Sequence, residues 1–104
     1  MEFGLKPETI TNIKGIFGEF PQIQKVILYG SRAKGNYRNG SDIDLAVLGE
    51  DLNLNVLNSI STKIDDLLLP YLIDLSIYNQ IRNPDLIEHI QRVGKIFYQK
   101  EELQ

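Results

Sequence analysis

Three aspartates in this chain of 104 residues have the types and spacing needed to bind divalent cations. Asp42 and Asp44 are two positions apart at the start of a segment of alternating hydrophobicity. Side chains along a strand alternate between its faces, so both carboxylates point the same way. Adjacent carboxylates repel unless hard cations bind between them, and Mg²⁺ is commonly held by one or two carboxylates plus substrate phosphates. The pair predicts a Mg²⁺ site, in the two-ion form that clamps the attacking and leaving oxygens of an in-line phosphoryl displacement.

Asp74 supplies a third acid, within the otherwise apolar segment 71–78. An unpaired carboxylate is costly in apolar surroundings. If this segment forms a strand beside the one that carries Asp44, Asp74 faces the pair, binds one metal ion and helps to deprotonate an attacking hydroxyl. The alternatives are structural: Asp74 pairs with an arginine or lysine, and Asp42 closes a turn or caps a strand.

Gly30 and Ser31 directly follow a β-rich segment and precede Asp42 by ten intervening residues, 32–41. Glycine lets the backbone approach a phosphate closely, and the serine hydroxyl with nearby backbone amides can donate to phosphate oxygens. Arg32 is a further candidate for binding the triphosphate. The basic side chains of this loop are as consistent with a solvated loop, and the roles of Lys34, Tyr37 and Arg38 stay open.

Periodicity predicts the elements that must position these residues. Helical spacing bounded by prolines predicts helices over 7–20, 54–68 and 84–93, with Asn83 capping the last and Gly94 ending it. β-rich or alternating segments predict strands over 25–29, 43–48, 71–78 and 95–98, and the remainder to Gln104 is expected to fray. The order predicts a layered α/β protein with one small sheet, in a single domain over 1–104.

Composition limits the partners and the location of the protein. It has no cysteine, which excludes a disulfide framework or a thiolate metal site. With 11 basic and 14 acidic residues its net charge is −3, so stable binding of a nucleic-acid duplex is not expected. The apolar runs are too short to span a membrane, and the first residues do not resemble a signal peptide. We therefore expect a cytoplasmic protein that does not enter the membrane.

The combined motif Gly30-Ser31-Arg32-Ala33-Lys34-Gly35 and Ser41-Asp42-Ile43-Asp44-Leu45 closely resembles the signature of the DNA polymerase β-like nucleotidyltransferase superfamily. The chain looks most like its minimal nucleotidyltransferase (MNT) branch. The resemblance implies an α/β (α+β) nucleotidyltransferase fold, a small mixed β-sheet flanked by helices. It also implies that Gly30 and Ser31 hold the triphosphate and that Asp42, Asp44 and Asp74 are the metal-binding catalytic carboxylates.

Many MNT proteins are antitoxins paired with a HEPN ribonuclease toxin. For this chain the resemblance therefore implies an enzyme that transfers AMP from ATP, with Mg²⁺, to a tyrosine of a cognate HEPN toxin. Larger relatives carry a second, substrate-binding domain that the sequence lacks, so a partner protein is expected to complete the site. The alternative is a catalytically inactive nucleotidyltransferase fold that neutralises a toxin by occlusion. His89, the single histidine, is interpreted as a solvated surface residue.

Overall fold

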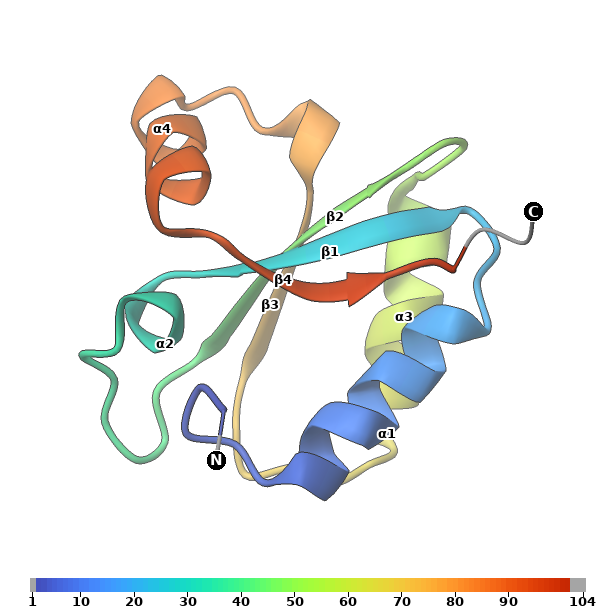
Figure 1. The fold of residues 1–104 in the computed structure, drawn as a ribbon. Helices are drawn as coiled ribbons and strands as arrows, with labels where there is room; N and C mark the ends of the chain where they lie inside the picture. Colours follow the sequence, from blue (N-terminus) through green and yellow to red (C-terminus); the bar gives the residue numbers. More distant parts are fainter. Residues whose placement is uncertain (1, 102–104) are drawn as a thin grey trace.

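The structure, a computed structural model, describes residues 2–101 and consists of one four-stranded sheet with helices on both faces (Figure 1). Its helices are α1 (Pro7–Gly18), α2 (Ser31–Lys34), α3 (Leu54–Asp65) and α4 (Pro84–Val93), with a short 3-10 helix η1 (Tyr78–Gln80). Its strands are β1 (Ile23–Tyr29), β2 (Ile43–Gly49), β3 (Ile73–Ile77) and β4 (Lys95–Gln99). The prediction of a mixed sheet flanked by helices is confirmed.

The strand order is β3-β2-β1-β4, and only the β2–β3 pair is parallel. Antiparallel neighbours can be joined by short connections, whereas parallel strands need a crossover, which here contains α3. The antiparallel β1–β2 pair brings the carboxyl end of β1 beside the amino end of β2, where Tyr29 is the partner of Asp44. The parallel pair places the start of β3 at the same end of the sheet.

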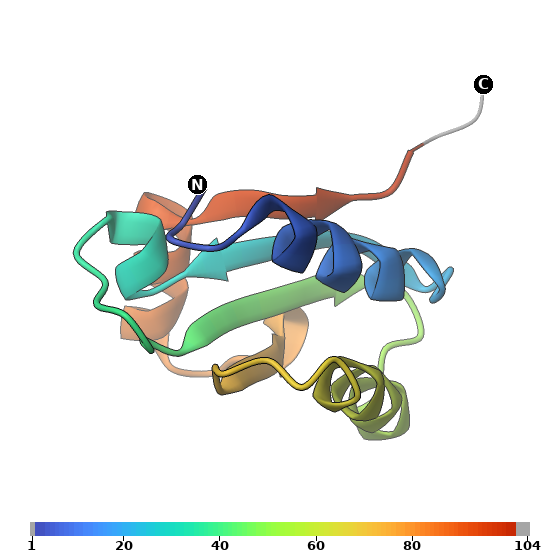
Figure 2. The same ribbon diagram turned by 90° about the horizontal axis from the view of Figure 1, so that it is seen from below.

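Each face of the sheet has its own apolar cluster. The main core lies between the sheet and helices α1 and α3, and it includes Phe17, Leu28, Leu45, Ile60 and Phe97. A smaller cluster of Tyr29, Ala46 and Ile90 packs the opposite face against α4. Figures 1 and 2 show α4 on the other side of the sheet from α1 and α3. The alternation of β2 explains this division, because Leu45 enters the main core while Ala46 faces α4.

The signals that predicted the starts of α1 and α4 are confirmed. Pro7 and Pro84 occupy the first turns of α1 and α4, and the side chain of Asn83 accepts hydrogen bonds from the backbone N–H groups of Asp85 and Leu86. The predicted ends of α1 and α3 are two and three residues too late, since the helices end at Gly18 and Asp65. The predicted strand 71–78 is shorter, Ile73–Ile77, because η1 begins at Tyr78.

The described residues also bear on two remaining expectations. Within residues 2–101, no helix has the length and apolar character needed to cross a membrane. Half of the tail predicted to fray, residues 102–104, lies outside the described residues. The start of the predicted tail, Gln99, instead ends strand β4.

Candidate active site

Tyr29, Asp44 and Asp74 form a row across three neighbouring strands on the face that also carries α4. Asp44 of β2 is the register partner of Tyr29 on β1 and of Asp74 on β3. Register partners in adjacent strands point to the same side of a sheet. The carboxylates of Asp44 and Asp74, called the acid row below, therefore lie side by side. This meets the condition of the sequence analysis that the strand of Asp74 be a neighbour of the strand of Asp44.

Asp42 precedes β2 by one residue and is exposed, whereas Asp44 is half-buried. Asp42 lies two residues before Asp44 in the chain, and its negative charge adds to the raised pKa of Asp44. Asp74 is exposed rather than enclosed in apolar surroundings, so the expectation of a buried acid in the third strand is wrong. The physical reason is that β3 is an edge strand, with a neighbouring strand on one side only.

The electrostatics of the row are those of uncompensated negative charge. Burial, followed by the charges of Asp74 and Asp42, raises the pKa of Asp44 above its ordinary 3.8, and His89 acts in the opposite direction. Burial also raises the pKa of Tyr29 above 10.0, with Asp74 and Asp44 adding to the effect and a hydrogen bond with the Ser76 side chain opposing it. The ion pairs of the described chain, Lys63–Glu19 and Arg92–Glu88, do not involve these acids.

Among residues 2–101, no group of three or more histidine, cysteine or acidic side chains is gathered closely enough to hold a metal ion by itself. Mg²⁺, however, is often bound by only one or two carboxylates together with phosphate oxygens of the substrate. An adjacent pair of carboxylates that forms no ion pair within residues 2–101, one of them with a raised pKa, suits such a cation. The residues therefore fit a metal site that phosphate oxygens of a substrate would complete.

Gly30 connects β1 to α2 in a conformation that favours glycine. Its φ of 76° and ψ of −156° lie in a region that other residues rarely adopt. A Cβ built on Gly30 would also collide with the carboxylate of Asp44. The chain thus turns directly against the acid row, and Ser31 begins α2 at this point.

Arg32 lies within the protein, with 2% of its surface exposed. Its guanidinium donates to the carbonyl oxygen of Ser41 at 3.0 and 2.8 Å and to that of Phe3 at 2.8 Å. It also lies over two aromatic rings, 4.7 Å from the centroid of Tyr71 and 5.4 Å from that of Tyr37. The side chain joins the loop 35–42 to the amino-terminal segment and does not extend to the acid row, and the binding role predicted for it stays a prediction.

His89 is a residue that the sequence interpretation misplaced. It is half-buried rather than solvated, and its Nε2 accepts a hydrogen bond of 3.0 Å from the backbone N–H of Gly30. Its ring meets that of Tyr29 edge-on, with centroids 6.1 Å apart. A signal was present in the sequence, because His89 is spaced three residues from Leu86 and therefore lies on the apolar stripe of α4.

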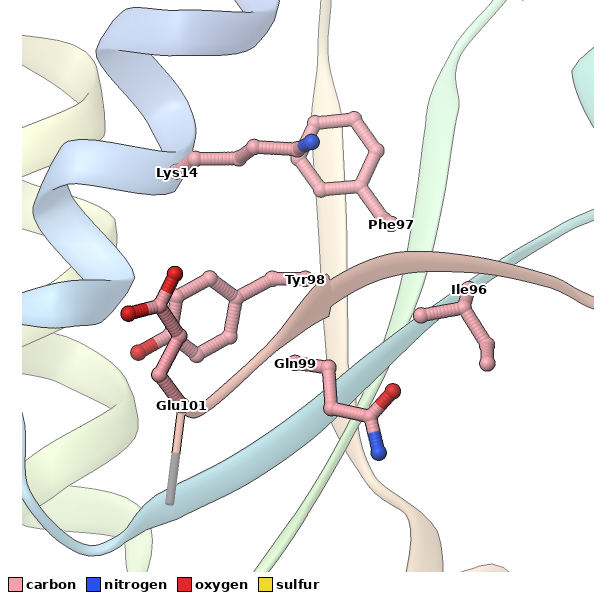
Figure 3. Close-up of a pocket in the computed structure, with 6 residues that line it drawn as sticks. All are labelled: Lys14, Ile96, Phe97, Tyr98, Gln99 and Glu101. Carbon is pink, nitrogen blue, oxygen red and sulfur yellow. The ribbon is translucent and has the colours of Figure 1, made fainter. Parts of the chain in front are cut away.

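Two surface recesses lie away from the acid row. One, of about 570 Å³, is lined by Lys14 of α1 and by residues 96–99 and 101 in and beyond β4 (Figure 3). Figure 3 shows Tyr98 directed toward α1, and Ile96 and Gln99 on the other side of the strand. The second, of about 280 Å³, lies around the start of α1. Neither includes Asp42, Asp44 or Asp74.

The family model described as polymerase β nucleotidyltransferase matches residues 11–103. This match spans most of the chain, and the chain belongs to that family. The acid row and the adjoining Gly30–Ser31 turn thus occur on a nucleotidyltransferase fold. A comparison with curated proteins finds no match.

Several solved structures share the fold. A toxin–antitoxin complex with AMP-PNP contains a chain that superposes with a TM-score of 0.70 at 24% identity, over 93% of this chain and 76% of that one. The complex of a tri-AMPylated HEPN toxin with an MNT antitoxin from Shewanella oneidensis gives 0.68 at 21%, over 92% and 74%. The MntA–HepT toxin–antitoxin complex gives 0.68 at 22%, over 91% and 74%.

Proposed function

We propose that this protein is a Mg²⁺-dependent nucleotidyltransferase that moves AMP from ATP onto a tyrosine hydroxyl of a HEPN-type toxin and thereby acts as its antitoxin. The observation that carries the proposal is the pairing of Asp44 with Asp74 beside the Gly30–Ser31 turn. Membership of the nucleotidyltransferase family supports the reaction class. The similar fold of an antitoxin in complex with a tri-AMPylated HEPN toxin supports the choice of acceptor.

The residues take the following roles in this proposal. Gly30 and Ser31 hold the triphosphate against the end of β1, and Asp42, Asp44 and Asp74 hold the metal. When bound, Mg²⁺ supplies positive charge that offsets the charge of the phosphates and orients them. The tyrosine oxygen attacks the α-phosphorus, the bond from that phosphorus to the bridging oxygen breaks, and pyrophosphate leaves. Asp74, the exposed acid of the row, accepts the hydroxyl proton directly or through a water.

We assign Arg32 to the shape of the site rather than to phosphate contact, because its guanidinium is occupied by the carbonyl oxygens of Phe3 and Ser41. Asp42 and Asp74 are exposed, which fits a site that a partner protein closes. The isolated chain is therefore expected to bind ATP with Mg²⁺ weakly, and the toxin is expected to tighten binding. Equal affinity with and without the toxin would remove this part of the proposal.

A second function is neutralisation of a toxin by occlusion without catalysis. One observation favours it: the described residues do not by themselves gather three metal ligands. A binding module of this kind would neutralise the toxin without transferring a nucleotide.

One experiment separates the two functions. The chain is mixed with Mg²⁺, ATP and the cognate HEPN toxin, and the products are weighed by intact mass spectrometry. Enzymatic transfer adds one or more AMP units to the toxin, and an Asp42→Ala, Asp44→Ala double variant abolishes both the adduct and neutralisation. Neutralisation that persists in the double variant without any adduct establishes occlusion instead.

A matched control tests whether the lost activity follows from position or from charge alone. Asp65 and Asp66 are exposed acids at the end of α3, which packs on the opposite face of the sheet. An Asp65→Ala, Asp66→Ala double variant removes the same charge and is expected to retain full transfer. Equal loss in both double variants would mean that net charge, and not the acid row, determines activity.

A further inference from the structure

We infer that His89 is a positioning residue that holds the Gly30–Ser31 turn in the conformation required for nucleotide binding. The inference rests on the proposed function, because it assigns the turn to the triphosphate. The observation behind it is the 3.0 Å hydrogen bond from the backbone N–H of Gly30 to Nε2 of His89, two residues separated by 59 positions in the sequence.

The peptide groups around Gly30 are fixed on both sides. Its N–H donates to His89 of α4, and its carbonyl oxygen accepts from the backbone N–H of Lys34 at 3.1 Å, which closes the first turn of α2. Its Cα lies against the carboxylate of Asp44. A glycine that loses its hydrogen bonds can adopt many other backbone conformations. The bond from α4 therefore selects one orientation of the Tyr29–Gly30 peptide, through which the chain enters the turn.

The bond assigns a definite role to the imidazole. A ring nitrogen that accepts a hydrogen bond carries no proton, so Nε2 is the acceptor nitrogen of His89 in this bond. The edge-on ring of Tyr29, which belongs to the same apolar cluster as Ile90, holds the imidazole from the β1 side. His89 thus acts through the backbone of Gly30 and not on the reacting atoms.

Three variants distinguish the role of His89 as a hydrogen-bond acceptor from the packing of its side chain. In His89→Gln the amide oxygen reaches the position of Nε2, whereas in His89→Asn the shorter side chain ends near the position of Nδ1. His89→Ala removes the acceptor altogether. All three lose the imidazole that packs on Tyr29, so a role limited to packing predicts the same result for each.

Two measurements are made on each variant. The first is hydrogen exchange of the Gly30 amide by ¹H–¹⁵N NMR on the free protein, which needs no activity. The second is steady-state transfer of AMP to the toxin, analysed as KM for ATP and kcat. We expect faster Gly30 exchange and a KM raised about fivefold to tenfold in the alanine and asparagine variants, with little change in kcat. The glutamine variant is expected to restore both values.

The inference is overturned if the glutamine and asparagine variants behave alike in both measurements, or if the alanine variant leaves Gly30 exchange unchanged. It is also overturned if exchange responds as expected while KM for ATP does not. If the wild-type chain transfers no AMP, the proposed function fails separately. The affinity for ATP with Mg²⁺, measured by calorimetry, then replaces KM, and an unchanged affinity in the alanine variant overturns the inference.

Discussion

Replacing Gly30 with alanine tests whether the turn and the acid row are one structural unit. The φ of 76° and ψ of −156° place Gly30 in a region where a side chain costs about 1–3 kcal/mol. The new Cβ also collides with the carboxylate of Asp44, and displacing that side chain from its rotamer costs a further ~0.5–1.5 kcal/mol. Together these effects predict a loss of about 2–4 kcal/mol, or roughly 10–20 °C in Tm for a domain of this size.

Two other glycines provide matched controls. Gly35 also has a positive φ, 89°, but no atom lies within 4 Å of a Cβ built there, so Gly35→Ala costs only the backbone strain of about 1–2 kcal/mol. Gly15 lies in the interior of α1 with open space around it, and Gly15→Ala is expected to stabilise the protein by about 0.5–1 kcal/mol.

The free energy of unfolding of each variant is measured by urea titration followed by circular dichroism. AMP transfer is measured at a temperature where all three variants are folded. We expect Gly30→Ala alone to abolish transfer, because it alone displaces Asp44. If Gly30→Ala is no more destabilising than Gly35→Ala, or if it transfers AMP normally, the packing of the turn against the acid row is not what fixes the site.

Three further predictions concern charge, core and loop. Burial, followed by the charges of Asp74 and Asp42, raises the pKa of Asp44, so this residue contributes fully to stability below its ordinary pKa of 3.8 and loses that contribution as pH rises through the raised pKa. Urea titrations in EDTA at several pH values should show this decline in the free energy of unfolding, and the Asp44→Asn variant should not show the decline. Phe17 is fully buried and edge-on to Phe97, so Phe17→Ala should lower the free energy of unfolding by about 3–5 kcal/mol. Leu68 is 88% exposed, and Leu68→Ala should change that free energy by at most ~0.5 kcal/mol. Arg32→Lys removes the planar guanidinium group and leaves carbonyl groups of Phe3 and Ser41 unsatisfied, which should lower the free energy of unfolding by about 2–3 kcal/mol. The same urea titration measures this loss, and a value below ~0.5 kcal/mol would contradict the structural role of Arg32.

The elements of the fold were predictable because their signals are local. The cap at Asn83 with Pro84 and the alternation of Ile43, Leu45 and Val47 are both encoded within a few residues. The ends of α1 and α3 were less predictable. Apolar residues beyond each helix, such as Phe20 and Leu67, pack against the core from non-helical backbone, so their spacing extends the helical pattern past the true end.

The approach of Asp74 to Asp44 was predictable only on the condition that their two strands are neighbours. Asp44 and Asp74 are on strands joined through α3, and nothing local to either strand determines that they are parallel neighbours or sets the register between them. The misjudged environments of Arg32 and Asp74 have the same origin. Arg32 is buried because Phe3 and Ser41, from separate segments, present carbonyl oxygens to it, and Asp74 is exposed because β3 is at the sheet edge.

The position of Gly30 explains how so small a chain can hold a site built from separate parts. The acids lie on β2 and β3, whereas the proposed phosphate-binding turn lies between β1 and α2. These two parts meet at Gly30. The Cα of Gly30 faces Asp44, its carbonyl oxygen accepts the first hydrogen bond of α2, and its N–H donates to His89 of α4. Since α4 packs on the acid face through Ile90, a displacement of α4 would move the turn relative to the acids. The sequence after residue 83 thus contributes to the geometry of a site whose predicted chemical groups all precede it.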